Sequence, residues 1–152
     1  MKDRIKLKVN EIKYETDDAL TLFFKQPLFG KISYKSGQFL TLIFDIDGRE
    51  YRRAYSINTT QGVDQDVAVT IKKVPGGVIS NYIWNRIKQG DKIPMLKPMG
   101  NFTLDPQKNE SRDIVLFGAG SGITPLMSIL KSTLYFGLSP ILGKKNLDLC
   151  LD

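Results

Sequence analysis

The hexapeptide RRAYSI, residues 52–57, places two arginines, a tyrosine and a serine in a stretch that otherwise has the pattern of a β-strand. A half-buried strand needs only alternating apolar residues. Arginine binds phosphate oxygens in a bidentate manner, tyrosine offers a flat face to another ring, and serine supplies a local hydrogen bond. Taken singly, a strand tyrosine or an exposed arginine requires no functional explanation. In combination, the three groups match a planar and anionic ligand, and a flavin nucleotide has both properties.

The segments around this hexapeptide show strand patterns of their own. Asp47–Gly48 is a turn-forming pair that separates the apolar run 38–44 from residues 50–57, which predicts a β-hairpin. Alternating apolar residues predict further strands, and together they indicate a mainly β fold, a six-stranded antiparallel barrel. These further strands are expected near residues 5–9, 20–24, 67–71 and 92–96.

One short helix is predicted within the strand pattern. Ile79, Ile83 and Ile87 are spaced four apart, and Ser80 is a suitable N-cap. The preceding Gly76–Gly77 pair makes a glycine-to-helix junction, whose exposed amides and serine hydroxyl are able to hold a phosphate. Taken alone, this segment is explained more simply as an ordinary loop and cap.

The sequence pattern changes after the polar segment DPQKNESRD, residues 105–113, which is predicted to separate a first domain, 1–106, from a second, 112–152. Beyond it, IVLFGAG at 114–120 has the continuous apolar pattern of a buried parallel strand that runs into glycines. Thr124–Pro125 is a favourable N-cap and N1 pair for a following helix. The expected unit is the opening strand, turn and helix of a nucleotide-binding α/β fold.

Three glycines, Gly118, Gly120 and Gly122, lie in this strand-to-helix turn. They allow the backbone to turn tightly and to approach a pyrophosphate, while the free amides of the next helix attract negative charge. The spacing departs from the usual G-x-G-x-x-G, and the alternative is a glycine-rich turn that binds nothing. The strand before the turn and the helix after it favour nucleotide binding.

The composition excludes several classes of catalytic site. The chain has no histidine, so Ser–His triads and histidine-ligated metal sites are excluded, and its single cysteine, Cys150, excludes an intramolecular disulfide and a cysteine-ligated iron–sulfur cluster. The net charge of +6 comes from lysines spread along the chain, which favours a solvated basic surface over a nucleic-acid stripe. The charged N-terminus has no signal-peptide core and no apolar run is long enough to cross a bilayer, so a cytoplasmic location is expected.

The ordered motifs resemble those of the ferredoxin–NADP reductase superfamily. They are Arg53-Ala54-Tyr55-Ser56, then Gly77-x-x-Ser80, then Gly118-x-Gly-x-Gly-x-x-Pro125, and the resemblance spans nearly all of residues 5–136. It implies a flavin-binding antiparallel barrel followed by the start of an NAD(P)-binding domain. Three motifs in the right order are much more specific than any one of them.

The resemblance also implies roles for particular residues. Arg53 would pair with the flavin pyrophosphate, Tyr55 would stack on the isoalloxazine, and Ser56 would hydrogen-bond near its reactive N5 edge, so that the last two act as catalytic residues. Other cofactor contacts would come from the phosphate loop and the strand before it, at Gly77, Val78, Ser80, Ile71 and Lys72, and from Ala54 within the first motif. The nicotinamide nucleotide would lie on Gly118, Gly120, Gly122, Thr124 and Pro125. Phe102 is either a cover for the adenine of FAD or a core side chain that closes the barrel.

The end of the sequence departs from this resemblance. The family's nucleotide-binding domain is a complete doubly wound sheet, whereas this chain is expected to contain its first strand and helix, with at most one more strand. The segment GLSPILGKKNLDLCLD, residues 137–152, alternates leucine with carboxylates, which a parallel strand buried on both faces should not do. This pattern suggests a truncated product or an altered reading frame after about Phe136.

The function that the resemblance implies is electron transfer from NAD(P)H through FAD, with FMN as the alternative flavin, to a protein acceptor such as an iron–sulfur protein. No metal site, nucleic-acid partner or membrane partner is expected, and the choice between NADH and NADPH stays open. One alternative is a flavin-binding module that does not turn over NAD(P)H because its nucleotide domain is incomplete. Another is a basic β-barrel that binds single-stranded nucleic acid through strand aromatics.

Overall fold

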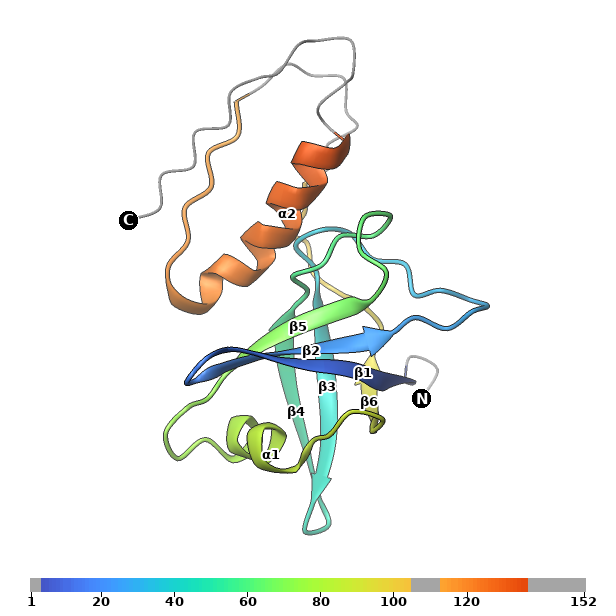
Figure 1. Ribbon diagram of the computed structural model, residues 1–152, viewed down its shortest axis with the longest axis vertical. Helices are drawn as coiled ribbons and strands as arrows, with labels where there is room; N and C mark the ends of the chain where they lie inside the picture. The colour runs from blue at the N-terminus through green and yellow to red at the C-terminus, as the bar shows by residue number, and fades with distance from the viewer. Residues whose placement is uncertain (1–3, 105–112, 137–152) are drawn as a thin grey trace.

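The computed structural model describes residues 4–104 and 113–136. Six strands form one antiparallel sheet in the order β4-β3-β6-β1-β2-β5 (Figure 1), which confirms the predicted six-stranded β fold. The strands are β1 Arg4–Thr16, β2 Ala19–Lys25, β3 Phe39–Ile46, β4 Arg49–Ser56, β5 Val67–Lys72 and β6 Lys92–Leu96.

The two edge strands of this sheet, β4 and β5, meet at one end and close it into a barrel. Ile57, just after β4, forms an antiparallel bridge with Val69 of β5. The next residue, Asn58, donates its backbone N–H to the carbonyl of Ala68 at 3.0 Å. This closure follows the last residues of β4, so the preceding part of β4 remains a sheet edge.

The barrel interior is filled by the alternating apolar residues of the strands. The largest side chains that are almost completely buried include Phe24, Leu40, Leu42, Ile57 and Met95. Because alternate residues of a strand point to opposite faces, this core fixes which side chains of each strand point outward. Three aromatic residues at the edge of this core, Phe39, Tyr51 and Trp84, are half-buried.

The predicted hairpin between β3 and β4 is confirmed. Asp47 and Gly48 both have positive φ, at 53° and 76°, as a two-residue type I′ turn requires. The side chain of Asp45 supports the turn by accepting the N–H of Gly48 at 3.1 Å. The hairpin sets the register that places Arg53 opposite Leu42 and Tyr55 opposite Leu40.

Helix α1, Val78–Arg86, is the predicted short helix, but Ser80 does not cap it. Gly77 occupies the N-cap position, and Ser80 lies in the first helical turn. Its hydroxyl accepts the backbone N–H of Val74 at 3.1 Å, because the tight turn between Val74 and Gly77 brings that amide against the helix. The predicted cap is therefore wrong.

The predicted parallel strand at 114–120 is also wrong. Residues 113–119 form no strand, and Val115 and Phe117 are 70% and 88% exposed. A parallel strand exists only beside hydrogen-bonding neighbours. The six described strands are all part of the barrel sheet.

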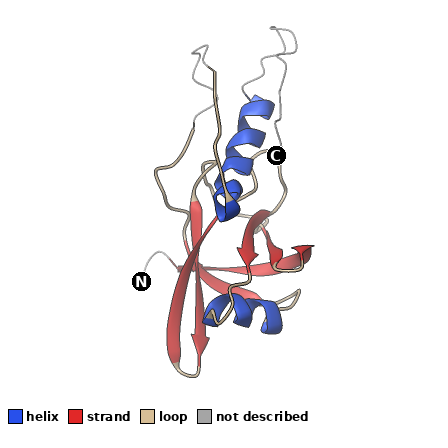
Figure 2. Ribbon diagram, turned by 90° about the vertical axis from the view of Figure 1, so that its left-hand side faces the viewer, coloured by secondary structure: helices blue, strands red, loops and turns tan. Residues whose placement is uncertain are grey.

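The predicted helix after the glycines is present, but its start differs from the prediction. A short 3₁₀ turn at Gly120–Gly122 leads into helix α2, Ile123–Phe136. Thr124 is therefore inside the helix rather than at its cap, and its hydroxyl donates to the carbonyl of Ser121 at 2.8 Å. Helices α1 and α2 lie at opposite ends of the barrel (Figures 1 and 2).

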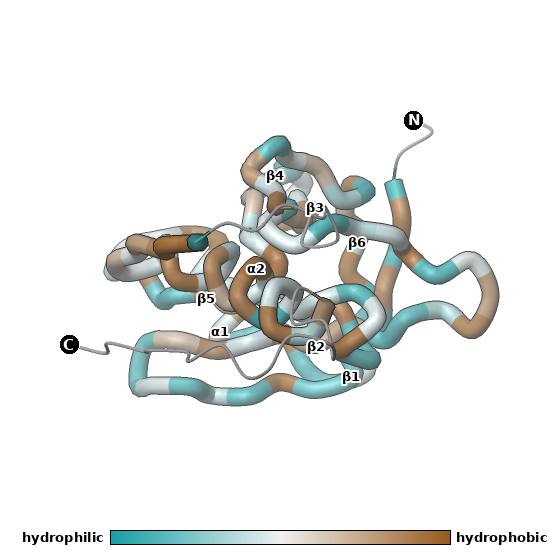
Figure 3. The backbone as a smooth tube through the Cα atoms, turned by 90° about the horizontal axis from the view of Figure 1, so that it is seen from above, coloured by the Kyte–Doolittle hydropathy of each residue, from teal (hydrophilic) through white to brown (hydrophobic). Residues whose placement is uncertain are grey.

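Helix α2 is fixed to the barrel through the loop that follows β4. The buried Ser128 hydroxyl donates to the carbonyl of Thr59 at 2.6 Å, and the Thr60 hydroxyl donates to the carbonyl of Ser128 at 2.9 Å. Lys131, one helical turn further on, forms a salt bridge with Asp64 at 3.2 Å. Seen from above, α2 lies over the barrel strands (Figure 3).

Tyr34 makes this region sensitive to alkaline pH. Its hydroxyl donates to the Thr59 hydroxyl at 3.1 Å, and burial raises the pKa of Tyr34 to about 12 from 10.0. The unfolded chain loses this proton near pH 10 and the folded chain near pH 12, so the contribution of Tyr34 to stability is fully present below pH 10 and is lost as pH rises. We expect a loss of about 2 kcal/mol in the free energy of unfolding between pH 9.5 and 11.5 from this group.

Urea unfolding at several alkaline pH values measures this loss. The matched variant is Tyr34→Phe, which keeps the ring and removes the titrating hydroxyl. Because lysines titrate in both proteins, the difference between the two pH slopes isolates Tyr34. Equal slopes in the two proteins would contradict the assignment.

Candidate functional site

The motif that contains Arg53 and Tyr55 lies on strand β4 at the edge of the sheet. These two residues share one face of the strand with Tyr51 and with Ile57 just beyond it, and both tyrosines pack against the core. Ile57 is completely buried, whereas Arg53 is exposed. The alternation of β4 therefore places a guanidinium and a phenol ring next to each other on its core-facing side.

The two arginines of the motif differ in their partners. Arg52 forms a salt bridge with Glu50 at 2.7 Å, and Arg4 binds the same carboxylate at 2.9 Å. The hydrogen bond from Arg52 and the nearby Arg4 hold the pKa of Glu50 below its usual value. Arg53 donates to the backbone carbonyl of Arg52 at 2.8 Å and has no carboxylate partner among the described residues. Arg53 is thus the guanidinium available to an external anion.

Tyr55 presents a neutral ring beside this guanidinium. Burial raises its pKa, and the positive charge of Arg53 lowers it by a smaller amount. The phenol therefore stays protonated at neutral pH, which suits stacking against an aromatic ligand. Ser56, the next residue, is half-buried and lies opposite Phe39 of β3, while Ala54 is exposed on the outer face of β4.

Ile71 and Lys72, the two β5 residues predicted to contact the cofactor, lie across the Ile57–Val69 bridge from the motif on β4. From the Ile57–Val69 bridge, the antiparallel register leads back along β4 to Tyr55 and forward along β5 to Ile71. The Ile71 side chain is completely buried, so its backbone is the part left for a ligand. Lys72 is exposed and its ammonium group lies 3.2 Å from Asp18. This register places Tyr55 of β4 across from the end of β5, and we call the region between β4 and the segment that joins β5 to α1 the seam.

The glycine loop before α1 has the shape of an anion cradle. Gly76 has a φ of +69°, and a Cβ on Gly77 would lie 2.8 Å from the Ser80 hydroxyl and 3.0 Å from the Val74 Cβ. Only glycine fits the second position without a shift. The first amides of a helix have no intrahelical acceptor, and Val78 at the start of α1 is 52% exposed. These amides, with the Ser80 hydroxyl beside them, suit a phosphate.

The loop also depends on Asn81, which was not predicted from the sequence. Its side-chain amide donates to the carbonyls of Gly77 at 2.6 Å and Val74 at 2.9 Å. These bonds satisfy the two carbonyl oxygens and fix the conformation of the loop. The carbonyls are therefore not turned toward the free amides at the start of α1, which stay available to an anion. An asparagine in the middle of a predicted helix gives no local signal for this role.

Comparison with known proteins agrees with this geometry. Residues 6–104 match the family described as the oxidoreductase FAD-binding domain. The chain belongs to this family. Its FAD-binding domain thus includes all six strands and α1.

Relatives of this FAD-binding domain include components of oxygenase systems. The chain is 40% identical over 134 residues to the ferredoxin reductase component of 3-ketosteroid-9-alpha-monooxygenase of Rhodococcus rhodochrous, covering 86% of this chain and 37% of that protein. A glycine betaine monooxygenase reductase from Pseudomonas aeruginosa is 38% identical over 120 residues, covering 77% and 31%. The chain spans about a third of the length of these relatives.

Solved structures show the same fold. The flavohem-like FAD/NAD binding domain of nitric oxide dioxygenase from Vibrio cholerae superposes with a TM-score of 0.74 at 25% identity, covering 88% of this chain and 57% of that one. A ferredoxin NADP⁺ reductase from Neisseria gonorrhoeae, with bound FAD and NADP, gives 0.72 at 25% identity, covering 86% and 52%. The fold of the FAD-binding domain and its place in the ferredoxin reductase superfamily are thus established.

The second predicted site lies outside the FAD-binding domain. Gly118, Gly120 and Gly122 are exposed, and Gly120 has a φ of +54°. Thr124 and Pro125 lie in the first turn of α2, and Thr124 is half-exposed. Because α2 docks on the loop after β4 and the segment before the turn forms no strand, the nicotinamide contacts stay a prediction.

Phe102, just after the barrel, is 62% exposed. This exposure excludes the interpretation of Phe102 as a core side chain that closes the barrel. Its alternative role, as a cover for adenine, stays a prediction.

The structure tests several other predictions only for the residues that it describes. No described helix has the length and apolar character to cross a membrane. The described residues contain no cluster of three side chains suited to a metal ion. The predicted domain boundary at 105–113 and the unusual segment 137–152 fall almost wholly outside the described residues.

Proposed function

We propose that this chain binds FAD in the seam between β4 and α1 and serves a cytoplasmic reductase that passes electrons from NAD(P)H to a protein acceptor. The observation that carries the proposal is the guanidinium of Arg53. It has no carboxylate partner within the described residues, and it lies beside the Tyr55 ring on the core-facing side of a sheet edge. An arginine, a neutral aromatic ring and a glycine loop at a helix N-terminus together suit a flavin with its pyrophosphate.

Each group in the seam has a defined part in this proposal. Arg53 binds the pyrophosphate from one side, and the Val78 amide binds it from the other with the Ser80 hydroxyl. The Gly77 amide, which was also predicted to bind, donates instead to the Val74 carbonyl at 2.9 Å, so Gly77 contributes the close approach of its backbone. Tyr55 orients the isoalloxazine by stacking, and Ser56 hydrogen-bonds near its reactive edge. When bound, FAD supplies the capacity to accept a hydride and to release electrons singly.

The proposal also covers the nucleotide half of the reaction. We assign the FAD-binding domain to residues 1–106 and the start of an NAD(P)-binding domain to residues 112–152. Gly118, Gly120, Gly122, Thr124 and Pro125 would contact the nicotinamide nucleotide. The acceptor would be an iron–sulfur protein, by analogy with the ferredoxin reductase component among the relatives.

A second candidate function is a flavin-binding module without NAD(P)H turnover. The exposed segment 113–117, which forms no strand, favours it, because a nucleotide-binding turn is normally positioned by its own parallel sheet. Both candidates place FAD in the same seam. The combination of this seam with a glycine cradle favours flavin over single-stranded nucleic acid.

The visible spectrum of the purified chain tests the proposal. We expect a yellow protein that releases FAD on denaturation, or apoprotein that takes up FAD when it is added. Anaerobic titration with NADH and NADPH then separates the two candidates, since bleaching of the flavin band indicates a reductase and an unchanged band indicates a module. A colourless protein that does not bind added FAD would overturn both.

A further inference from the structure

A cavity lies at the end of the barrel opposite α1. It is open to solvent, has a volume of about 420 Å³ and is lined by α2 and three loops, which contain residues 33–36, 60–62 and 103–104. Ligand-binding pockets commonly have volumes of this order, from roughly 300 to 1,000 Å³. None of its lining residues belongs to the seam where we place FAD.

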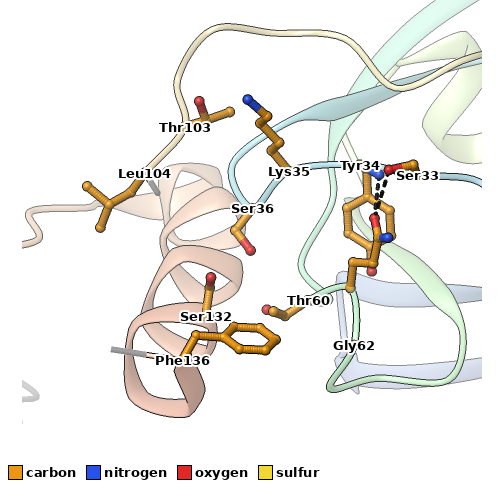
Figure 4. Close-up of a pocket in the computed structure, with 11 residues that line it drawn as sticks. Ser33, Tyr34, Lys35, Ser36, Thr60, Gly62, Thr103, Leu104, Ser132 and Phe136 are labelled. Atoms are coloured by element: carbon orange, nitrogen blue, oxygen red, sulfur yellow. Dashed lines mark hydrogen bonds between the residues drawn. The ribbon is translucent and has the colours of Figure 1, made fainter. Parts of the chain in front are cut away.

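Two serines that are largely buried direct their hydroxyls into this cavity. Ser36 and Ser132 are 7% and 6% exposed, and their hydroxyls point toward each other across the space (Figure 4). Neither hydroxyl has a hydrogen-bond partner among the described residues, whereas the hydroxyls of Tyr34, Ser33 and Thr60 all have one. No fully buried side-chain oxygen or nitrogen of the described residues lacks a partner, so both of these hydroxyl oxygens are accessible from the cavity and free to bind a ligand.

The rim of the cavity carries a positive charge. Lys35 is exposed and extends toward Thr103 (Figure 4), and it has no ion pair within the described residues. The lining contains no aspartate or glutamate. The C-terminal half of α2 also faces the cavity, and the partial negative charge at the end of a helix opposes an anion there. An anion bound at this rim would therefore depend on the Lys35 ammonium.

We propose that this cavity binds a small phosphorylated polyol, with the phosphate at Lys35 and Thr103 and polyol hydroxyls on Ser36 and Ser132. A lysine ammonium and a threonine hydroxyl are common phosphate partners. The serine hydroxyls both donate and accept, which matches the hydroxyls of a polyol. The Phe136 ring lies against Gly62 on one wall and offers an apolar face to the carbon chain of the ligand.

Two-dimensional ¹H–¹⁵N NMR of the FAD-loaded protein tests the proposal, with sorbitol 6-phosphate as the probe. FAD is added so that the glycine loop before α1 is already occupied and does not bind the phosphate of the probe. The same spectra are also recorded without FAD, so that the test does not depend on whether the chain binds flavin. We expect concentration-dependent shifts at residues 33–36, 60–62 and 132–136. Sorbitol and inorganic phosphate, each of which meets only half of the site, should bind more weakly by about tenfold.

Substitutions at the rim of the cavity and deeper inside it provide a second test. Lys35→Gln should weaken binding of the probe by about tenfold, and so should the double variant Ser36→Ala with Ser132→Ala. The matched control is Lys31→Gln, which removes an exposed lysine outside the cavity and should leave the affinity unchanged. Because Lys35 is exposed, its replacement should not disturb folding, which thermal unfolding checks.

Two outcomes would overturn the proposal. One is an absence of shifts at the cavity residues, including the case in which shifts occur only at the α1 cradle or at the glycine turn before α2. The other is an equal affinity of the probe for the Lys35→Gln and Lys31→Gln variants. Neither outcome depends on whether the chain oxidises NAD(P)H.

Discussion

Replacement of Arg53 by alanine is expected to lower the affinity for FAD by about a hundredfold or more. A guanidinium makes two charge-assisted hydrogen bonds to a phosphate, and each contributes roughly 1.5–3 kcal/mol. No other arginine of β4 is available to replace it, because Arg52 is held by Glu50 and Arg49 lies over the ring of Tyr51 at 5.1 Å. Fluorescence titration of the apoprotein with FAD measures the change.

Arg52→Ala is the matched control for this experiment. It removes the same charge one residue away, on the opposite face of β4, where the guanidinium is engaged by Glu50. We expect its affinity for FAD to stay within about twofold of the unaltered chain, since an exposed ion pair contributes little. Equal losses in the two variants would mean that only the overall charge of β4 matters, and the proposed seam would then be wrong.

Replacement of Gly37 by alanine is expected to lower the free energy of unfolding by about 3 kcal/mol or more. Gly37 has a φ of +96°, in the region that disfavours side chains, and an added Cβ would overlap the backbone carbonyl of Phe102 and lie 3.2 Å from Ile129 of α2. Backbone cannot rotate away as a flexible side chain does. The loop before β3, the segment after β6 and α2 would all have to shift.

Gly48→Ala separates the two causes of this loss. Gly48 also has a positive φ, of +76°, but nothing lies within 4 Å of an added Cβ. We therefore expect it to cost only the conformational penalty, about 1 kcal/mol. Chemical denaturation of both variants measures the difference, and similar losses in the two would show that close packing at Gly37 is not what excludes a side chain.

Much of the barrel was predictable because its signals are local. Alternating apolar residues such as Leu20, Leu22 and Phe24 define which face of a strand is buried, whatever the strand pairs with. Asp47–Gly48 fixes a two-residue turn through its own backbone preferences, and the hairpin register follows from it. The isoleucines of α1 are similarly sufficient to predict a helix.

The errors arose where the outcome depends on partners. Ser80 has the local character of an N-cap, but the turn from Val74 to Gly77 places the helix start earlier and gives the hydroxyl another partner. Residues 114–117 have the composition of a buried strand, yet a strand requires neighbours to accept its hydrogen bonds. No local pattern specifies such neighbours.

The candidate site shows the same division. The sequence by itself determined the residue types of the motifs, their order and the barrel that carries them, because apolar periodicity and turn chemistry act over a few residues. Only the tertiary structure decided that Arg4 joins Arg52 on the Glu50 carboxylate, that the Asn81 amide meets the carbonyls of the glycine loop, and that Ser36 and Ser132 share one cavity. The physical reason is that Arg4 and Glu50, like Ser36 and Ser132, are far apart in the chain, and that even the shorter-range contact of Asn81 needs a loop conformation that exists only after the core has packed.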